Sequence, residues 1–222
     1  MGKKALAEKA EFDKAVGLTN SISGSFLAAL KFILAIILLP LVFGVSKGFL
    51  LKIVRQPGYI RNNFIAAAGI YLLIHLFVYP PRIIYDLGQR VIGKIFNFFV
   101  PLRRIMYYCL PFYSVLFFAL FFIFKAMFGY SDIAGYFIFL VSFSSVMHLL
   151  ITAVYLKEES SHALKGDYFF FLVIVYLAGI VLLSGFLSVM TDDFSFTYPI
   201  DYGYKFFTDT LSSVWRQFFV VR

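Results

Sequence analysis

Long apolar runs alternate with short polar segments along almost the whole chain. Five runs are long enough for a membrane crossing or close to it, at 26–45, 64–79, 105–124, 133–155 and 168–190. A helix of about 20 apolar residues spans the hydrocarbon core of a bilayer, and a helix satisfies its backbone polar groups within its own segment. The pattern therefore predicts an all-α integral membrane protein with about five transmembrane helices, which form one membrane domain at 26–190.

The first apolar run leaves two topologies open. Residues 26–45 are long enough to cross as one helix, but Pro40 lies in the second half of the run, where it predicts a kink. If the chain instead turned at Pro40, the run would form a hairpin and return to the side on which it began. Run length favours the crossing helix, whereas the distribution of Lys and Arg slightly favours the hairpin. We take the crossing helix as the prediction.

Two further segments have a helical pattern with one apolar side and one polar side. In 83–99, apolar residues recur every three or four positions and cationic residues take the other side; in 205–222, Trp215 marks the apolar side. Amphipathic helices of this kind lie in the plane of the membrane interface, where tryptophan is enriched. We predict two interfacial helices. For the first, packing on a partner subunit is the alternative.

The remaining long segments are polar and are expected outside the membrane. The N-terminal segment 1–25 contains a short charged helix with four lysines, which favours the cytoplasmic side. No early apolar region is followed by a cleavage site, so the first span is expected to act as an uncleaved anchor. The stretch 191–204 holds aspartates, a proline and a glycine, and it predicts a loop before the C-terminal helix.

Composition supports the membrane location and narrows the partners. Hydrophobic residues make up 61% of the chain and charged residues 14%, whereas soluble domains carry about 25% charged residues. The net charge of +8 comes largely from Lys and Arg that flank the apolar runs, where they contact anionic lipid and set orientation. We therefore expect the lipid bilayer and other membrane subunits, or a second copy of the chain, as partners, and no nucleic acid. The outline is typical of proteins of the bacterial inner (cytoplasmic) membrane.

Polar residues inside the predicted spans are few, and they are the candidates for function. His148 has Ser144 four residues before it and Thr152 four residues after it, so the three share one helix face. His75 lies in the second span, four residues before Tyr79, and a hydrogen bond to that phenol is the structural interpretation. An ionisable group in a span suggests a solute path or a proton relay, whereas interhelical hydrogen bonding is the structural alternative. No Asp or Glu lies inside the five predicted spans, which disfavours ion-driven transport.

Two other sets of residues are assigned to lipid contact and to helix packing. Basic residues around the connection 80–104 suit phosphate headgroups; they are Arg82, Arg90, Lys94, Arg103 and Arg104. Small residues let helix backbones approach closely in lipid. The candidates for such packing are Ala66, Ala67 and Gly69 in the second span, and Ser184, Gly185 and Ser188 in the fifth.

The sequence predicts no catalytic residue, metal site or cofactor. Glu159 and His162 have the spacing of one helical di-iron ligand pair, but such a site needs two pairs and further glutamates. Neither a nucleophile motif nor a phosphate-binding glycine loop is present. These observations favour a non-catalytic subunit that scaffolds or anchors a larger membrane assembly. A channel or transporter that uses the polar face around His148 is the alternative, and a lipid-modifying membrane enzyme is the second alternative.

Overall fold

The described part of the chain is built from α-helices. The computed structural model describes residues 3–78, 82–97, 106–128, 133–159 and 166–219, with side chains of the first helix described from Phe26 onward. The helices are α1 (Lys3–Val54), α2 (Gly58–Phe77), α3 (Arg82–Ile95), α5 (Phe112–Phe128), α6 (Ala134–Glu159), α7 (Gly166–Met190) and α8 (Thr197–Phe219). No strand occurs within these ranges, which confirms the all-α prediction.

Four of these helices are long and apolar enough to cross a membrane, which confirms a helical membrane protein. Their apolar segments are Phe26–Val54 in α1, Gly58–Phe77 in α2, Ala134–Glu158 in α6 and Tyr168–Met190 in α7. The fifth predicted span corresponds to α5, whose 17 residues measure about 25 Å at about 1.5 Å per residue. This is shorter than the hydrocarbon core of about 30 Å, so α5 is a short fifth apolar helix.

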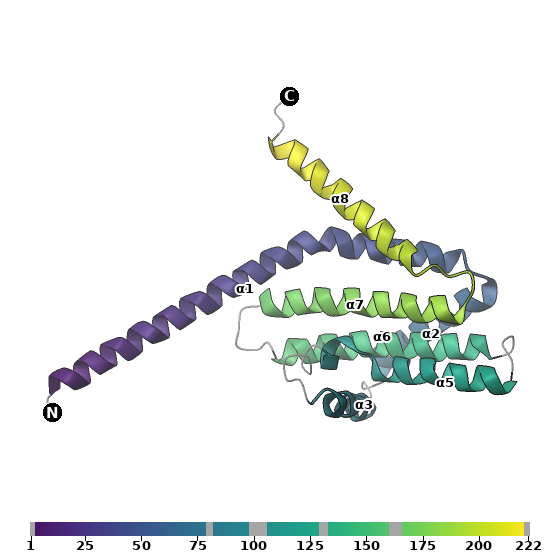
Figure 1. Cartoon of the computed structure of the whole chain (residues 1–222), viewed down its shortest axis with the longest axis horizontal. Coiled ribbons are helices and arrows are strands. Elements are labelled where there is room, and N and C mark those ends of the chain that lie inside the picture. The colour runs from purple at the N-terminus through teal and green to yellow at the C-terminus, as the bar shows by residue number, and fades with distance from the viewer. Residues whose placement is uncertain (1–2, 79–81, 98–105, 129–132, 160–165, 220–222) are drawn as a thin grey trace.

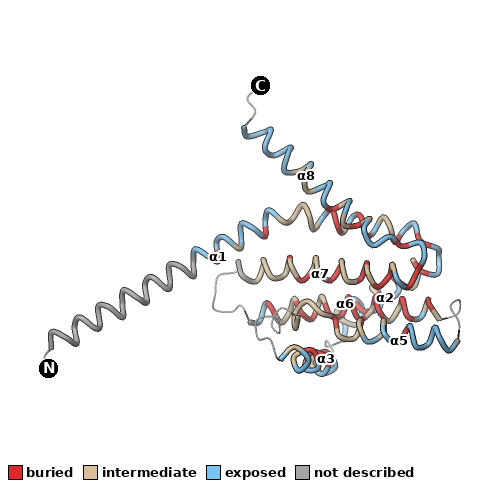
Figure 2. The backbone as a smooth tube through the Cα atoms, viewed as in Figure 1, coloured by how far each residue is buried: buried red, intermediate tan, exposed pale blue. Residues whose placement is uncertain are grey.

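The helix α6 is the centre of the bundle. It packs against α2, α5 and α7, while α1 packs on α7. Figure 1 shows α5, α6 and α7 side by side, with α1 along the outer side of α7. Buried positions follow α6 and the inner side of α7 in Figure 2, and the core includes the fully buried residues Phe121, Ile138, Val141 and Leu187. Consecutive helices among α5, α6 and α7 run antiparallel, as expected for helices joined by short connections.

The first apolar run belongs to one continuous helix, so the hairpin alternative is wrong. The helix α1 runs from Lys3 through Pro40 to Val54, and the short charged helix expected in 1–25 is its first part. Figure 1 shows a change of direction partway along α1. Since proline lacks the N–H that the helix ladder needs at that position, Pro40 accounts for the predicted kink without ending the helix.

The predicted limits of three spans are wrong. The first span continues to Val54 and does not end at 45. The helix α2 begins at Gly58 and not at 64, directly after Pro57. The third span begins at Phe112 and not at 105, because a helical turn at 106–109 ends before Pro111. Proline disfavours the helical conformation of the residue before it, so the chain breaks there and restarts. The observed limits of α6 and α7 lie close to the predicted 133–155 and 168–190.

The C-terminal helix starts earlier than predicted. The expected loop at 191–204 covers only 191–196, and α8 begins at Thr197. Pro199 lies in the first turn, where backbone N–H groups have no intrahelical partner and proline is tolerated. The predicted amphipathic helix at 205–222 is therefore the second part of a longer helix.

The helices α1 and α8 cross at glycines. A Cβ atom on Gly44 would lie 2.8 Å from Cα of Gly203, and one on Gly48 would lie 3.0 Å from Cα of Pro199. Small residues four apart on one helix allow this backbone approach. The spacing Gly44-x-x-x-Gly48 indicates such a contact in the sequence, but these glycines were not among the predicted packing residues.

The helix α3 lies beside the C-terminal half of α6 and the start of α5, and it presents three faces. It appears nearly end-on in Figure 1, where the spans run across the view. It turns Tyr85, Gly88, Gln89 and Ile92 into the protein. Its exposed apolar side chains include Leu87 and Val91, and its exposed cationic side chains include Arg90 and Lys94. An apolar face beside a cationic face on a helix perpendicular to the spans supports the interfacial placement predicted for 83–99, of which 98–99 lie outside the described residues.

Candidate functional site

The polar face predicted on the fourth span exists and faces α3 and α5. Ser144, His148 and Thr152 are all buried, with at most 2% of each residue exposed. Each of the three is hydrogen-bonded to a group outside α6. The face is therefore a packed interface between helices.

His148 links three segments of the chain. Its Nε2 atom lies 3.0 Å from the Tyr108 carbonyl oxygen, and its Nδ1 atom lies 3.0 Å from Nε2 of Gln89. A carbonyl only accepts, so Nε2 of His148 carries the proton and donates it, while Nδ1 accepts from the Gln89 amide. The two contacts thus define a neutral imidazole in one tautomer, with neither ring nitrogen left for a solute.

A serine cluster lies one turn from His148 toward the N-terminal end of α6. Oγ of Ser114 on α5 is 2.9 Å from Oγ of Ser144 and 2.9 Å from Oγ of Ser145. Ser144 also donates to the Leu140 carbonyl at 2.8 Å. Small hydroxyl residues that bond across a helix pair hold the two backbones close, so this cluster fastens α5 to α6.

Tyr85 extends the polar face on the other side of His148. Its hydroxyl is 2.7 Å from Oγ1 of Thr152. Its ring lies between the rings of His148 and Tyr155, with centroids 5.7 Å from each. Burial of the hydroxyl raises the pKa of Tyr85 well above its ordinary value, because the charged form loses its water. Tyr85 is therefore a neutral packing group at any physiological pH.

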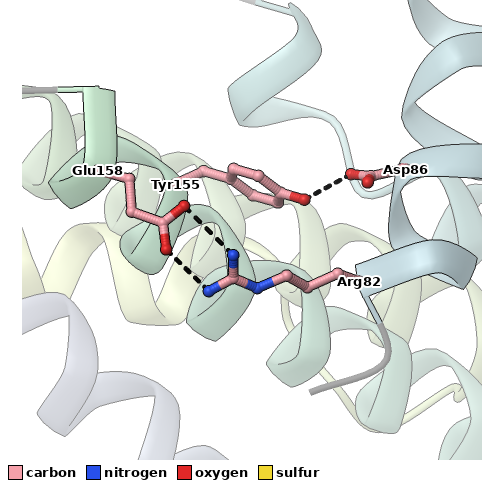
Figure 3. A network of polar contacts seen from close by, with 4 residues as sticks. All are labelled: Arg82, Asp86, Tyr155 and Glu158. Atoms are coloured by element: carbon pink, nitrogen blue, oxygen red, sulfur yellow. Dashed lines mark hydrogen bonds and ion pairs between the residues drawn. The ribbon is translucent and has the colours of Figure 1, made fainter. Parts of the chain in front are cut away.

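The polar face ends in two contacts that fasten α3 to the end of α6 (Figure 3). The Arg82 guanidinium bonds both carboxylate oxygens of Glu158, at 2.8 Å and 3.3 Å. The Tyr155 hydroxyl donates to Oδ1 of Asp86 at 2.7 Å, and Arg82 also lies over the Tyr155 ring. The side chains of Arg82 and Glu158 are 30% and 51% exposed, so solvent screens this ion pair.

The residues predicted to contact lipid headgroups divide into three groups. Arg82 pairs with Glu158, so its charge is already compensated within the chain. Arg90 and Lys94 are exposed on the cationic face of α3, which suits the predicted contact. Arg103 and Arg104 lie outside the described residues.

His75 lies apart from the polar face. Its ring is tilted against that of Tyr71, with centroids 6.1 Å apart. Nδ1 of His75 and the hydroxyl of Tyr71 have no hydrogen-bond partner among the described residues. The predicted partner of His75, Tyr79, lies outside the described residues.

The predicted small packing residues differ in how far they are buried. Ala67 is fully buried, but Ala66 is exposed, and a Cβ on Gly69 would meet nothing within 4 Å. The small residues of 64–79 therefore do not form one packed stripe. Ser184 is buried and bonds its own helix at Ile180. Gly185 and Ser188 are partly buried.

Sequence reasoning missed Gln89 and Ser114, which complete the polar face. Gln89 falls on the polar side of the predicted amphipathic helix, yet it is 1% exposed and bonded to His148. Its side chain turns inward and its amide donates to Nδ1 of His148. Ser114 stands in an apolar run, and its partners lie 30 and 31 residues away, so no local pattern marks it.

The opposite face of α6 is apolar and lines a cavity of about 390 Å³ between α1, α2, α6 and α7. Polar groups and open space thus lie on different sides of α6. Within the described residues no group of three or more His, Cys, Asp or Glu side chains is placed to hold a metal ion. Comparison with known proteins finds no matching family model, no similar curated protein and no similar solved structure.

Proposed function

We propose that this protein is a non-catalytic integral membrane subunit that anchors a larger membrane assembly, and that it does so through α8. The observation that carries this proposal is the unpaired end of that helix. Every residue from 211 to 219 is exposed, and α8 packs mainly on α1. Figure 1 shows its C-terminal end pointing obliquely away from the bundle.

The exposed end of α8 has the character of a docking surface. One face carries Leu211, Val214, Trp215 and Phe218, and the last two are 62% and 76% exposed. The opposite face carries Asp209 and Arg216. In lipid alone the charged face of this oblique helix would lie in hydrocarbon, and in water alone its apolar face would be exposed. Burial against another membrane chain, or a second copy, covers the apolar face, and aromatic side chains are enriched in such interfaces.

The packing of the polar face argues against the transport alternative. A solute path along Ser144, His148 and Thr152 needs free polar groups beside open space. Here these groups bond one another and α3 and α5, while the cavity lies on the other face of α6. The lipid-enzyme alternative needs a free acid beside a basic residue, whereas Glu158, the acid beside Arg82, forms an ion pair with it.

The location that we propose is the bacterial inner membrane, with the N-terminus in the cytoplasm. With α1 crossing once, the segments on the N-terminal side of the bundle carry slightly more Lys and Arg than those on the other side. Basic residues are retained on the cytoplasmic side, which supports this orientation.

The test is the mass of the gently solubilised native complex, with its components identified by mass spectrometry. We compare the wild type with the triple substitution V214A, W215A and F218A, which removes the apolar side chains. The matched control, S212A, S213A and Q217A, changes three other exposed residues of the same turns. We expect partners at fixed stoichiometry in the wild type and the control, and their loss in the apolar triple variant. A wild type that runs alone as a monomer would refute the proposal.

A further inference from the structure

The cavity on the apolar side of α6 is large enough for a ligand, and nearly all of its wall residues are apolar. Its volume of about 390 Å³ lies in the range of small-molecule sites, about 300–1,000 Å³. All four long apolar helices contribute to its walls. Its wall residues include Ser46, Leu50, Phe64, Ala68, Leu72 and Tyr176.

The two polar groups in the wall satisfy each other. The Ser46 hydroxyl donates to the Val42 carbonyl oxygen at 2.6 Å. The Tyr176 hydroxyl lies 2.9 Å from Oγ of Ser46, and it must donate there because the serine proton is already used. The cavity wall therefore offers a polar solute no free hydroxyl donor, and its chemistry selects a hydrocarbon occupant.

The cavity opens sideways into the bilayer. α1 packs on α7 and α2 packs on α6, whereas α1 and α2 barely contact each other. Leu50 on α1 and Leu72 on α2 line the cavity and remain 55% and 46% exposed. The gap between these two spans is the mouth, and the medium around it is lipid acyl chains.

One cation shares a face of α2 with three wall residues of the cavity and lies about one turn before the first of them. Arg61, Phe64, Ala68 and Leu72 are spaced three and four residues apart on α2, so they share one helix face. Arg61 lies in the first turns of α2, toward the end of the span. An arginine on this face, nearer the end of the span than the wall residues, matches the negative charge of a lipid phosphate.

We propose that the cavity between α1, α2, α6 and α7 binds one acyl chain of a phospholipid, whose phosphate lies at Arg61. The site is independent of α8 and of any assembly that α8 supports. The bound chain fills a space that the helices leave open, and it holds α1 against α2 where the two make little direct contact.

The experiment is native mass spectrometry of the protein released from nanodiscs made of palmitoyl-oleoyl phosphatidylglycerol. We expect one lipid to remain on the wild type after loosely held lipid has been removed by collisional activation. Ala68→Phe places a ring in the cavity, while the matched control Ala66→Phe places the same ring on an exposed position of α2. Displacing about two methylene groups should lower the lipid-bound fraction about tenfold in Ala68→Phe, and the control should match the wild type.

Arg61→Gln tests the headgroup contact without changing the cavity walls. We expect the bound fraction to fall about fivefold, the effect of one basic residue near an anionic lipid. The proposal is overturned if the wild type retains no lipid, if Ala68→Phe retains as much as the wild type, or if Ala66→Phe loses as much as Ala68→Phe. Loss in Ala68→Phe with no change in Arg61→Gln would overturn the assignment of the phosphate to Arg61.

Discussion

Replacement of His148 by phenylalanine should destabilise the bundle, because it removes one hydrogen bond to α3 and one to the turn at 106–109. Phenylalanine keeps most of the ring volume but removes both contacts. The Tyr108 carbonyl then loses its 3.0 Å donor and Nε2 of Gln89 loses its 3.0 Å acceptor. Gln89 keeps a longer contact to the Leu110 carbonyl at 3.4 Å, so its loss is partial.

The expected magnitude follows from these two groups. A lost hydrogen bond costs about 0.5–1.5 kcal/mol, and a buried group left without a partner costs up to about 3 kcal/mol, so His148→Phe should lower the free energy of unfolding by about 1–4 kcal/mol. In membrane bundles the unfolded state also finds partners, and single interhelical bonds average about 0.6 kcal/mol, which sets the lower limit near 1 kcal/mol. His148→Gln is the matched variant: its amide N–H can still donate to the Tyr108 carbonyl, and it should lose about half as much.

The measurement is unfolding in mixed micelles, in which increasing dodecyl sulfate is followed by far-ultraviolet circular dichroism. The order of stability should be wild type, then His148→Gln, then His148→Phe. If His148→Phe unfolds with the wild type, or if His148→Gln is the less stable of the two variants, the two hydrogen bonds do not fix this face. His148 would then be available for the solute path that the packing disfavours.

Three further predictions use the same unfolding measurement. Glu158→Gln should cost at most about 1 kcal/mol, because its ion pair with Arg82 is exposed; a larger loss would mean that the pair is shielded from water. Gly44→Leu should lower the free energy of unfolding by about 1–3 kcal/mol, because it forces α1 and α8 apart. Gly69→Ala has open space around it and should raise the free energy of unfolding by up to about 1 kcal/mol through helix propensity. Equal effects of the two variants would contradict the close crossing of α1 and α8. The raised pKa of Tyr85 means that its phenol resists ionisation in the folded state. The stability that Tyr85 contributes is therefore complete below the ordinary tyrosine pKa of about 10 and falls as pH rises above it. Tyr85→Phe should lessen this loss of stability at alkaline pH, and an unchanged pH profile would show that Tyr85 does not cause the loss.

The helical membrane class and the approximate spans follow from the sequence because the bilayer imposes them locally. Apolar length alone predicts α6 and α7 to within a few residues. Proline effects were harder to judge from sequence, since they depend on position. Pro40 only bends a long helix, Pro111 ends one segment before the next begins, and Pro199 sits in a first turn.

The sequence predicts the α6 side of the candidate site but not the partners of its residues on other helices. The spacing of Ser144, His148 and Thr152 on one helix places them on a common face, and this is a local property. Their partners Gln89 and Ser114 come from helices far away in the sequence, and the pairing depends on how those helices pack. An amphipathic pattern shows which side of α3 is apolar, but it cannot show that one polar side chain turns inward to meet a histidine.

The chain's single tryptophan gives α8 an optical signal of its own. Trp215 is 62% exposed and stacks on Phe219, with ring centroids 4.2 Å apart, on the end of α8 that leaves the bundle. Its emission therefore reports the surroundings of this one helix, whereas circular dichroism reports the helical content of the whole chain. A blue shift on reconstitution would record the entry of α8 into an apolar contact. A melt followed by tryptophan emission would time the release of α8, which need not coincide with unfolding of the spans.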